Sequence, residues 1–371
     1  MTRPMRVLHL LSSTGFHGAE SMTAELVRQL SILGVEIHVA AFDSGNGGNT
    51  EVLQAVEGHA SGVVSIPCQG PLDRRALALM NRYIDEQHID LVHSHKYKTT
   101  FYAMPGRWSG RYRLVTTYHN WLMHTRALRL YALLDKRLAR FNDAAVAVST
   151  PVSTELRRFV PTSKVHQIDN GIDTQHFARQ WSKAEAREAL GLSPTQAVIG
   201  FVGRLSDEKG LPSLIEALRD PALAHTHTLL TGEGDARPAL EALIQQAGLQ
   251  DRVQLLGNRR DTPLIYAAMD VFVLPSVLEA FPMVLLEAMA CGCPVIATDV
   301  GEVGRIIEPE RTGLIVPAGN PPALIQALSR VLSDAEWGKR MGFAGAERVC
   351  STYSSRAMAE RYLEVYQHSL R

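Results

Sequence analysis

The first half of the chain alternates short apolar runs with longer stretches of helical spacing. Residues 6–11 (RVLHLL) form a continuous apolar run, and residues 19–33 after it repeat apolar side chains every three or four positions. Further strands are predicted over residues 36–42, 90–93, 114–118 and 144–148, and a further helix over residues 72–86. Alternation of this kind is typical of a parallel sheet covered by helices on both faces.

The second half repeats the same order of elements. Strands are predicted over residues 197–203, 226–232, 253–257, 270–274 and 295–298, helices over 212–218 and 238–247, and a helix-rich tail over 321–332 and 334–371. We therefore predict an α/β fold with two domains, a first domain over 1–168, a linker over 169–195, a second domain over 196–353, and a C-terminal helix over 354–371 that packs back on the first domain.

Composition narrows the class of protein. The 371 residues carry 38 basic and 38 acidic side chains, so the basic excess of a nucleic-acid binder is absent and no nucleic-acid partner is expected. The four cysteines show no disulfide-framework spacing, and the start MTRPMRVLHLL runs straight into a strand. No apolar run reaches the ~20 residues of a spanning helix. We expect a cytoplasmic protein, and any membrane contact would be peripheral, at the inner face.

One predicted helix leaves two interpretations open. Between residues 119 and 143, apolar side chains keep helical spacing at Leu128, Tyr131, Leu134, Leu138 and Phe141, and basic ones lie between them at Arg126, Arg129, Lys136, Arg137 and Arg140. A basic amphipathic helix can lie on an anionic membrane surface. The favoured alternative is a helix whose apolar face covers the core and whose charged face is solvated.

The stretch from Ser276 to Gly301 holds the strongest candidate site. Pro282 marks the start of a predicted helix over residues 283–290. Glu279 then lies in the loop before the helix, and Glu287 lies about one and a half turns inside it. The N–H groups of the first helical turn carry partial positive charge, which suits a phosphate. Two hydroxyl-binding carboxylates beside an anion site favour a sugar nucleotide.

A loop after the first strand of the second half supplies cations. Gly203, Arg204 and Lys209 follow that strand, where an arginine fork and a lysine point charge can bind a pyrophosphate. The same charges would stabilise a departing diphosphate. The alternative is that both cations are solvated loop charges. The sequence GEGD at residues 232–235 lacks the third glycine of a dinucleotide fingerprint, so NAD binding is not expected.

Histidines and glycines mark the corresponding edge of the first half. His95 and His119 fall at the ends of predicted strands, where ligands of parallel sheets bind, although such histidines can also serve structural hydrogen bonds. Gly15 and Gly18 lie in the first loop, where the backbone turns tightly or approaches a ligand. Metal binding is not expected, because His93 and His95 alternate along a strand and so face opposite sides.

Several segments together resemble a known family. GRLSDEKG, TGEGDARPALE, VQLLGNRRD, DVFVLPSVLEAFPMVLLEAMACGCPVIATDVG and TGLIVPAGN are similar in order and spacing to the retaining glycosyltransferases of family four, which have the GT-B fold. In the first half the similarity is looser, at GFHGAE, VHSHK, YHN and DNGID. The sequence departs from the family in two places. After DVG it carries Glu302, Gly304 and Arg305 where the family often has a second glycine and later Pro-Glu, and Ala280 replaces the commoner glycine.

The resemblance implies two Rossmann-like domains facing each other across a cleft, with the donor nucleotide on the second, the acceptor mainly on the first, no metal, and no cofactor apart from the nucleotide-sugar substrate. By position it implies Glu279 near the donor sugar hydroxyls and Glu287 on the ribose. The implied catalytic residues are His119, Glu279, Arg204 and Lys209. The implied donor-binding residues are Gly15, Gly18, Gly203, Arg204, Lys209, Gly232, Arg259, Glu279, Ala280, Phe281, Pro282, Met283, Val284 and Glu287. His95 and Asn120 are implied on the acceptor side.

The resemblance therefore predicts a retaining, metal-independent transfer of a sugar from a UDP- or GDP-sugar to a glycan or lipid-linked acceptor in cell-surface polysaccharide biosynthesis. Two alternatives stay open. One is a nucleotide-sugar epimerase or phosphorylase of the same fold, and the other is a protein that binds nucleotide sugars without catalysis.

Overall fold

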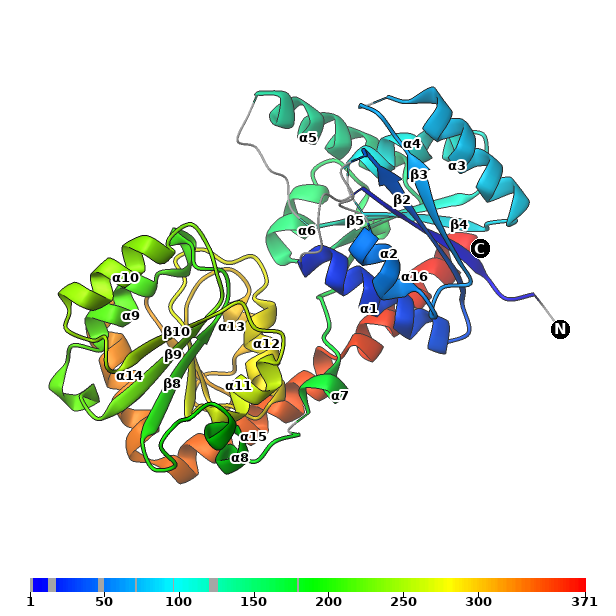
Figure 1. Cartoon of the computed structure of the whole chain (residues 1–371). Coiled ribbons are helices and arrows are strands. Elements are labelled where there is room, and N and C mark those ends of the chain that lie inside the picture. The colour runs from blue at the N-terminus through cyan, green and yellow to red at the C-terminus, as the bar shows by residue number, and fades with distance from the viewer. Residues whose placement is uncertain are drawn as a thin grey trace. The chain divides into compact units, whose positions relative to one another are not determined.

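The computed structural model describes residues 3–12, 18–45, 50–70, 72–95, 97–119, 126–178 and 180–371. Two compact units make up the chain: unit 1 is Met1–Gly171 with Ser355–Arg371, and unit 2 is Ile172–Ser354 (Figure 1). The chain thus changes unit twice, after Gly171 and after Ser354. The stretch expected as a linker supplies two short helices of unit 2, α7 (Thr174–Phe177) and α8 (Lys183–Ala189).

Unit 1 is built on a parallel sheet of seven strands in the order β3-β2-β1-β4-β5-β6-β7. Its strands are β1 (Arg6–Leu11), β2 (Glu36–Asp43), β3 (Gly62–Pro67), β4 (Leu91–Ser94), β5 (Arg113–Tyr118), β6 (Ala144–Ala147) and β7 (Val165–Gln167). The five inner strands are the ones that the apolar runs predict. The two edge strands, β3 and β7, were not predicted, because an edge strand is only partly buried and needs no continuous apolar run.

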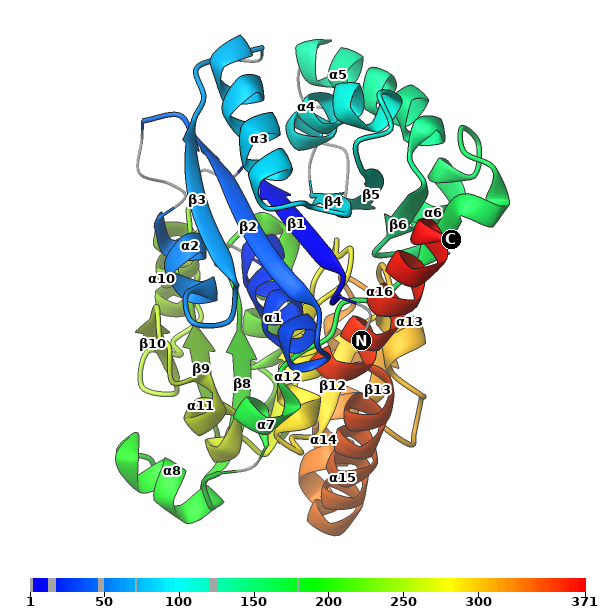
Figure 2. The same ribbon diagram turned by 90° about the vertical axis from the view of Figure 1, so that its right-hand side faces the viewer.

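Helices cover both faces of this sheet. They are α1 (Gly18–Ile32), α2 (Thr50–Val56), α3 (Arg74–Glu86), α4 (Tyr97–Trp108), α5 (Arg126–Leu138), α6 (Thr150–Leu156) and α16 (Ser355–Leu370), with 3₁₀ turns at Ala139–Phe141 and Thr162–Lys164. One core joins the sheet to α1, α2 and α16, and another joins it to α3 and α4. Helices α1 and α16 lie side by side, as Figures 1 and 2 show. The C-terminal helix is therefore an integral part of unit 1.

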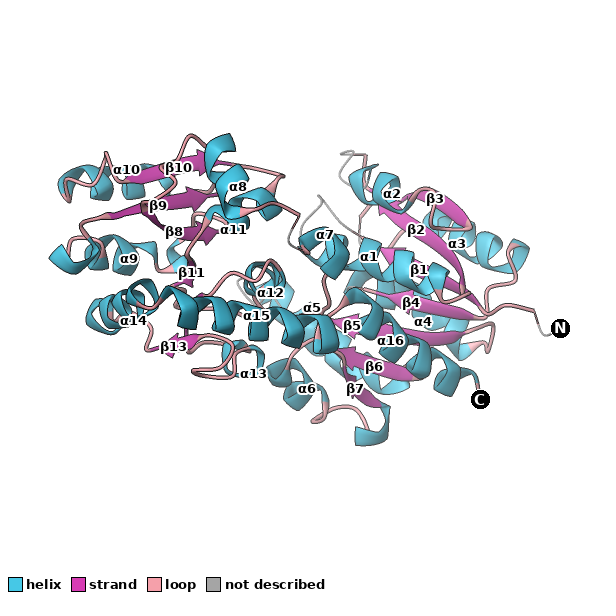
Figure 3. Cartoon of the chain, turned by 90° about the horizontal axis from the view of Figure 1, so that it is seen from below, coloured by secondary structure: helices cyan, strands magenta, loops and turns pink. Residues whose placement is uncertain are grey.

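Unit 2 repeats the architecture with six parallel strands in the order β10-β9-β8-β11-β12-β13 (Figure 3). The strands are β8 (Ala197–Val202), β9 (Thr226–Thr231), β10 (Val253–Gly257), β11 (Val271–Leu274), β12 (Val295–Thr298) and β13 (Leu314–Val316). Besides α7 and α8, its helices are α9 (Leu211–Ala217), α10 (Arg237–Gln246), α11 (Thr262–Ala268), α12 (Met283–Ala290), α13 (Val303–Ile306), α14 (Pro321–Ser333) and α15 (Ala335–Thr352), with 3₁₀ turns at Asp207–Lys209 and Pro221–Leu223.

Strand order reverses once in each sheet. In unit 1 the reversal lies between β1 and β4, and in unit 2 it lies between β8 and β11. In open α/β sheets, ligands bind at the carboxyl ends of the two strands that flank such a reversal, because the loops there diverge to opposite faces. In unit 2 these are the loops after Val202 and after Leu274, which carry the predicted cations and carboxylates.

The favoured interpretation of the basic helix is wrong in one respect. On α5 the side chains of Asp135 and Lys136 are buried, whereas Leu133 and Leu134 are each more than a third exposed. Lys136 tolerates burial because its ammonium binds the Glu155 carboxylate at 2.7 Å. Two leucines thus lie on the outward face of the helix. Within the described part of the chain, however, every helix is too short or too polar to cross a bilayer.

Candidate functional site

Backbone contacts fix the loops at the carboxyl edge of unit 2. The N–H of Gly203 donates to the carbonyl of Thr231 at 2.9 Å, and Gly232 has φ 134°. A Cβ on Gly232 would lie 1.9 Å from the carbonyl oxygen of Gly203. Only glycine fits such an approach, so these two predicted positions serve to bring the loops after β8 and β9 together.

The next close approach brings the β8 loop to the β11 loop. Lys209 ends a 3₁₀ turn, and Gly210 after it adopts φ 61°. A Cβ on Gly210 would lie 2.1 Å from the carbonyl oxygen of Pro275. The N–H of Val277 then donates to the carbonyl of Glu208 at 2.8 Å. The chain is thereby held so that Lys209 lies beside the residues that follow β11.

Lys209 and Glu279 form an ion pair at this junction. The Lys209 ammonium lies 2.5 Å from Oε1 of Glu279, and the hydroxyl of Ser276 donates to the same oxygen at 2.7 Å. The two charged side chains are only 16% and 9% exposed. An ion pair so shielded is rigid and electrostatically strong, since water screens it little. Two of the predicted catalytic residues are therefore brought together.

Helix α12 begins beside Glu279. It runs over Met283–Ala290, as the sequence predicts, and Pro282 is its N-cap residue. The loop before it is fixed from behind by Gly301, where a Cβ would lie 2.2 Å from the Glu279 carbonyl oxygen. The first-turn N–H groups of a helix have no intrahelical acceptor, so the start of α12 offers donors with partial positive charge to an anion.

Glu287 is the second carboxylate of the site. The hydroxyl of Tyr266 on α11 donates to its Oε2 at 3.0 Å. Desolvation raises the pKa of Glu287 to about 7, although the Tyr266 hydrogen bond opposes that rise. A carboxyl group with this pKa changes charge near neutral pH. It therefore either accepts two hydrogen bonds as an anion or donates one as an acid.

Two predicted cations lie apart from the ion pair. The Arg204 side chain is 69% exposed and lies 3.5 Å from Glu208, and Arg259 binds both carboxylate oxygens of Asp261 at 2.8 and 2.5 Å. The structure thus places Arg204 in the same loop as Lys209 but on its surface. Arg259 follows β10, two strands away from β8 in the sheet.

In unit 1 the predicted residues are only partly described. Gly15 and Asn120 lie outside the described residues, and Gly18 is the first residue of α1. His119 directly follows β5, and its ring stacks on that of His95 with centroids 6.4 Å apart and an interplanar angle of 25°. Both histidines therefore lie at the carboxyl edge of the sheet, as predicted.

The argument that separated His93 from His95 is wrong. Their ring centroids lie 4.1 Å apart, and together with His9 they form a buried cluster whose ligand atoms all lie within 4.8 Å. Strand β4 ends at Ser94, so the alternation of side chains no longer applies at His95. The expectation that no metal takes part in the reaction stays a prediction.

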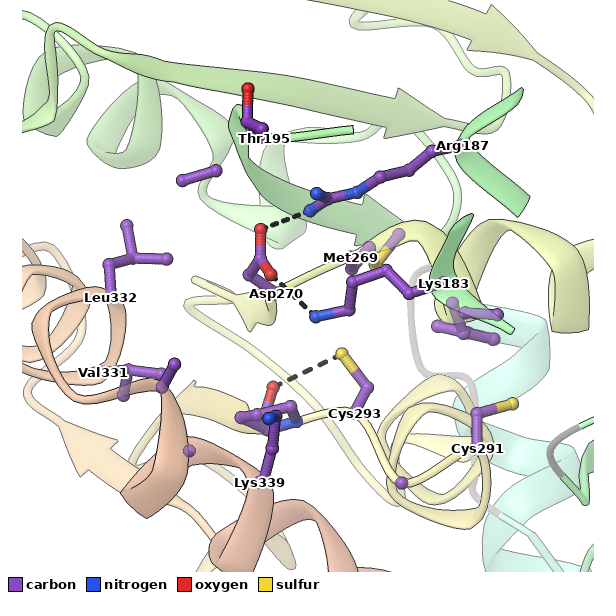
Figure 4. Close-up of a pocket in the computed structure, with 17 residues that line it drawn as sticks. Lys183, Arg187, Thr195, Met269, Asp270, Cys291, Cys293, Val331, Leu332 and Lys339 are labelled. Carbon is purple, nitrogen blue, oxygen red and sulfur yellow. Dashed lines mark hydrogen bonds and ion pairs between the residues drawn. The ribbon is translucent and has the colours of Figure 1, made fainter. Parts of the chain in front are cut away.

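A cavity of about 390 Å³ opens at the amino edge of the unit 2 sheet, opposite the candidate site (Figure 4). The charged side chains that line it have a structural role. Asp270, which precedes β11, binds Lys183 at 2.7 Å and Arg187 at 2.6 Å. The thiols of Cys291 and Cys293 also line it, and burial raises the pKa of Cys291 far above its usual value. The ion pairs attach α8 to the start of the sheet, and a protonated thiol is unreactive.

Two contacts of the site were missed from the sequence. Ser276 binds Glu279 across three residues, and Tyr266 binds Glu287 across twenty-one. A serine that follows a buried strand gives a weak signal. Tyr266 gives none, because its role depends on the packing of α11 against α12.

Comparison with known proteins identifies the family. The model described as Glycosyl transferases group 1 matches residues 182–348, and that described as Glycosyltransferase Family 4 matches residues 16–176. The lipopolysaccharide core biosynthesis mannosyltransferase LpsB of Rhizobium meliloti is 31% identical over 245 residues, covering 64% of this chain and 68% of the relative. The chain belongs to the group 1 glycosyltransferases. The sequence resemblance is thereby confirmed.

A further relative and a solved structure extend the comparison. The Escherichia coli UDP-Gal:alpha-D-GlcNAc-diphosphoundecaprenol alpha-1,3-galactosyltransferase is 28% identical over 275 residues, covering 71% of each chain. The structure of Anabaena Alr3699/HepE in complex with UDP superposes with a TM-score of 0.84 at 23% identity, over 97% of this chain and 99% of that one, which confirms the GT-B fold. Matches to three curated relatives span 55%, 68% and 62% of each relative's length.

Gly210 should be intolerant of a side chain. Gly210→Ala is expected to destabilise unit 2 by about 2–4 kcal/mol. The left-handed backbone at this position disfavours any side chain, and the new Cβ would also overlap the Pro275 carbonyl. The matched control is Gly248→Ala, which has φ 68° and open space around it and should cost about 1 kcal/mol. Hydrogen exchange of the β8 and β11 amides measures both, and equal losses would contradict the steric argument.

Glu287 should lower the stability of unit 2 at neutral pH. Its folded pKa of about 7 lies above the unfolded value of 4.5, so the folded state favours the protonated form, and stability is lost as pH rises from 4.5 through 7. Glu287→Gln removes this loss and should stabilise unit 2 by about 2–3 kcal/mol at pH 8.

Hydrogen exchange of the unit 2 strands at pH 8 and pH 4.5 measures this difference, which should shrink towards zero at the lower pH. The control is Glu336→Gln on α15, because the Lys339 hydrogen bond holds the pKa of that exposed carboxyl low. A gain in the control, or none at Glu287, would refute the assignment.

Proposed function

We propose that the protein transfers a sugar from a nucleoside diphosphate to a glycan or lipid-linked acceptor, with retention of configuration at the anomeric carbon. The observation that carries the proposal is the shielded Lys209–Glu279 ion pair, which Ser276 orients next to the first turn of α12. The pair lies where the strand order of unit 2 reverses. A cation, an oriented carboxylate and free helix amides suit a sugar diphosphate at that place.

The chemistry follows from where charge develops. The bond from C1 of the sugar to the diphosphate oxygen breaks, and its electron pair stays on that oxygen. The Lys209 ammonium and the α12 amides are placed to stabilise the new charge. The acceptor hydroxyl oxygen then bonds to C1 from the same face, and its proton passes to the departing diphosphate. Glu279 would bind hydroxyls of the donor sugar.

Glu287 would hold the ribose hydroxyls of the nucleotide. With a pKa near 7 it is largely ionised above neutral pH, where a carboxylate accepts two hydroxyl hydrogen bonds. A UDP- or GDP-sugar is the proposed donor, in keeping with the UDP bound by HepE and the UDP-Gal in the name of the Escherichia coli relative. The names of that relative and of LpsB support a cell-surface glycan or its lipid-linked precursor as the acceptor.

Two substitutions separate the proposed roles. Lys209→Ala should slow turnover about 100-fold, because it removes charge that acts on the leaving group. Glu287→Ala should instead weaken nucleotide binding about 10-fold or more, because it removes hydrogen bonds to a charged group. Calorimetric titration with UDP, GDP and ADP measures binding, and a donor panel with added acceptor measures turnover. Lys339→Ala, an exposed lysine on α15, should change neither.

The results also separate the alternatives. Failure to bind any of the three nucleotides would overturn the proposal. Binding without turnover would indicate a sensor, and conversion of the donor without an acceptor would indicate an epimerase. Equal effects of the two alanine variants would contradict the separate roles of Lys209 and Glu287.

We further propose that unit 1 contacts an anionic membrane through an exposed patch, defined here as Trp108, Leu133, Leu134, Arg137, Arg140 and Phe141. The Trp108 side chain is 61% exposed and its ring meets that of Phe141 at 6.0 Å. The Arg140 guanidinium lies 4.7 Å from the Phe141 ring. Exposed apolar side chains next to arginines favour the boundary between lipid headgroups and acyl chains. Such contact would bring unit 1 to a lipid-linked acceptor.

Liposome flotation tests the patch. The double variant Arg137→Glu/Arg140→Glu should lose at least half of its recovery on vesicles that contain anionic lipid, because charge reversal turns attraction into repulsion. Arg340→Glu on α15 of unit 2 makes the same kind of charge change away from the patch and should float like the wild type. If the double variant floats equally well, the patch does not bind the membrane.

A further inference from the structure

A connected set of polar side chains crosses the core of unit 1 and takes no part in the proposed chemistry. Its members come from α1, β1, the end of β4, β5 and α16. They are Thr23, His9, His93, His95, Thr117, Tyr362 and Tyr366, and all are buried. Polar groups in a core cost free energy unless they are hydrogen-bonded, so a set this large requires an explanation.

The hydrogen bonds of the set form one continuous chain. The Tyr366 hydroxyl lies 2.6 Å from Nδ1 of His93 and 3.5 Å from Nε2 of His9. His9 Nδ1 lies 3.0 Å from Nε2 of His95, whose Nδ1 lies 3.4 Å from the Thr23 hydroxyl. The chain thus joins α16 to the sheet and reaches α1 at Thr23.

At its other end the chain returns to the same helix. Nε2 of His93 lies 2.7 Å from the Thr117 hydroxyl, which lies 2.9 Å from that of Tyr362. Tyr362 and Tyr366 are four residues apart and so face the sheet together. Two turns of α16 are therefore attached through hydroxyl groups to three strands of the sheet and, through His95, to α1.

The protons of this chain are fixed by its connectivity. These bonds use both ring nitrogens of each histidine, and all of them are satisfied when every histidine carries one proton and the bonds point the same way along the chain. Either of the two directions meets this condition. Both require three neutral histidines, and the members include hydroxyls and imidazoles but no carboxylate to balance a positive charge.

We propose that this chain is an acid-sensitive latch, which holds α16 on unit 1 while its histidines are neutral and releases the helix when one of them is protonated. A proton added to a buried ring creates a charge that the surrounding apolar core cannot solvate. The same ring on a released helix or an opened sheet edge is solvated by water. Acid therefore favours release.

The direction of the pH effect follows from the difference between the pKa values of the histidines in the attached and in the released state. Burial lowers the pKa of His9 to about 3 and holds that of His93 well below its usual value. The released histidines would titrate near 6.5, so attachment weakens as pH falls below about 6.5. The ionisable groups on the neighbouring elements include the buried Glu20, one turn before Thr23 on α1, and His119 after β5, whose charge would oppose protonation of His93.

A second histidine contact lies near the end of α16. His166 on β7 is half-buried, and both its burial and the charge of His368 on α16 lower its pKa. This pair also weakens attachment in acid, so an experiment must separate it from the buried chain. His368 is exposed and can be replaced without disturbing the core.

Hydrogen exchange of the full-length protein tests the latch. After correction for intrinsic exchange, protection of residues 355–371 should fall about eightfold or more between pH 6 and pH 5, since release lets at least one histidine with a pKa near 6.5 take up a proton. Helix α14 of unit 2 is the reference and should change much less. A flat profile for α16, or an equal fall in both helices, would overturn the proposal.

Variants locate the effect in the buried chain. Tyr366→Phe removes the hydroxyl between His93 and His9 and should lower α16 protection about tenfold at pH 7.5. His368→Gln should keep the pH slope of the wild type. If that variant instead loses the slope, the sensor is the His166–His368 pair and the proposal fails.

Two further measurements use the unmodified chain. Nitrogen NMR shifts should show His9 and His93 neutral at pH 5.5 wherever α16 stays protected, and protonated rings under a protected helix would refute the latch. Metal analysis after purification without chelators should find less than 0.1 equivalent of a transition metal. A stoichiometric ion lost in His93→Gln would overturn the proposal, because it would occupy the nitrogens that form the chain.

Discussion

The candidate site depends on an ion pair that the backbone forces together. Lys209 and Glu279 are seventy residues apart in sequence, and their loops meet because Gly210 lies against the Pro275 carbonyl and Gly301 against that of Glu279. Desolvation of such a shielded pair costs free energy, and removal of one partner would leave the other buried charge unpaired. The fold can keep it because β8 and β11 are neighbours in the sheet, so the loops that follow them start side by side. The strand order thus brings the two loops to the same edge of the sheet, and the glycines let them approach closely enough for the salt bridge to form.

Glu287 shows that the site is not arranged for stability. A glutamate whose pKa is raised to about 7 by its surroundings destabilises the folded state at neutral pH, and glutamine could make the same hydrogen bond with Tyr266 without that cost. Residues that disfavour folding persist where function requires them. The energetic penalty at Glu287 is therefore independent support for a ligand contact, and it does not rely on similarity to other proteins.

The sequence predicted the features that depend on neighbouring residues and missed those that depend on tertiary packing. Apolar runs located the inner strands, and Pro282 with the spacing of Glu279 and Glu287 located α12 and the carboxylates, because these signals arise from neighbouring residues. Tyr266 carried no signal, since its hydrogen bond depends on how α11 packs. The argument on His93 and His95 failed because it continued a strand past Ser94. On α5, apolar spacing alone could not show that Lys136 would be buried by pairing with Glu155.

The two units use buried polar groups in opposite ways. In unit 2 a charged pair lies at the carboxyl edge, where a ligand can complete its solvation, whereas in unit 1 a neutral chain of histidines and hydroxyls runs through the core. Their pH ranges differ accordingly. Glu287 gains its proton near pH 7, and the histidines would be protonated only on release, below about pH 6.5. Mild acidification should therefore protonate Glu287, and so weaken the nucleotide contact proposed there, before it loosens α16. The order of the two events follows from the different environments of the two groups.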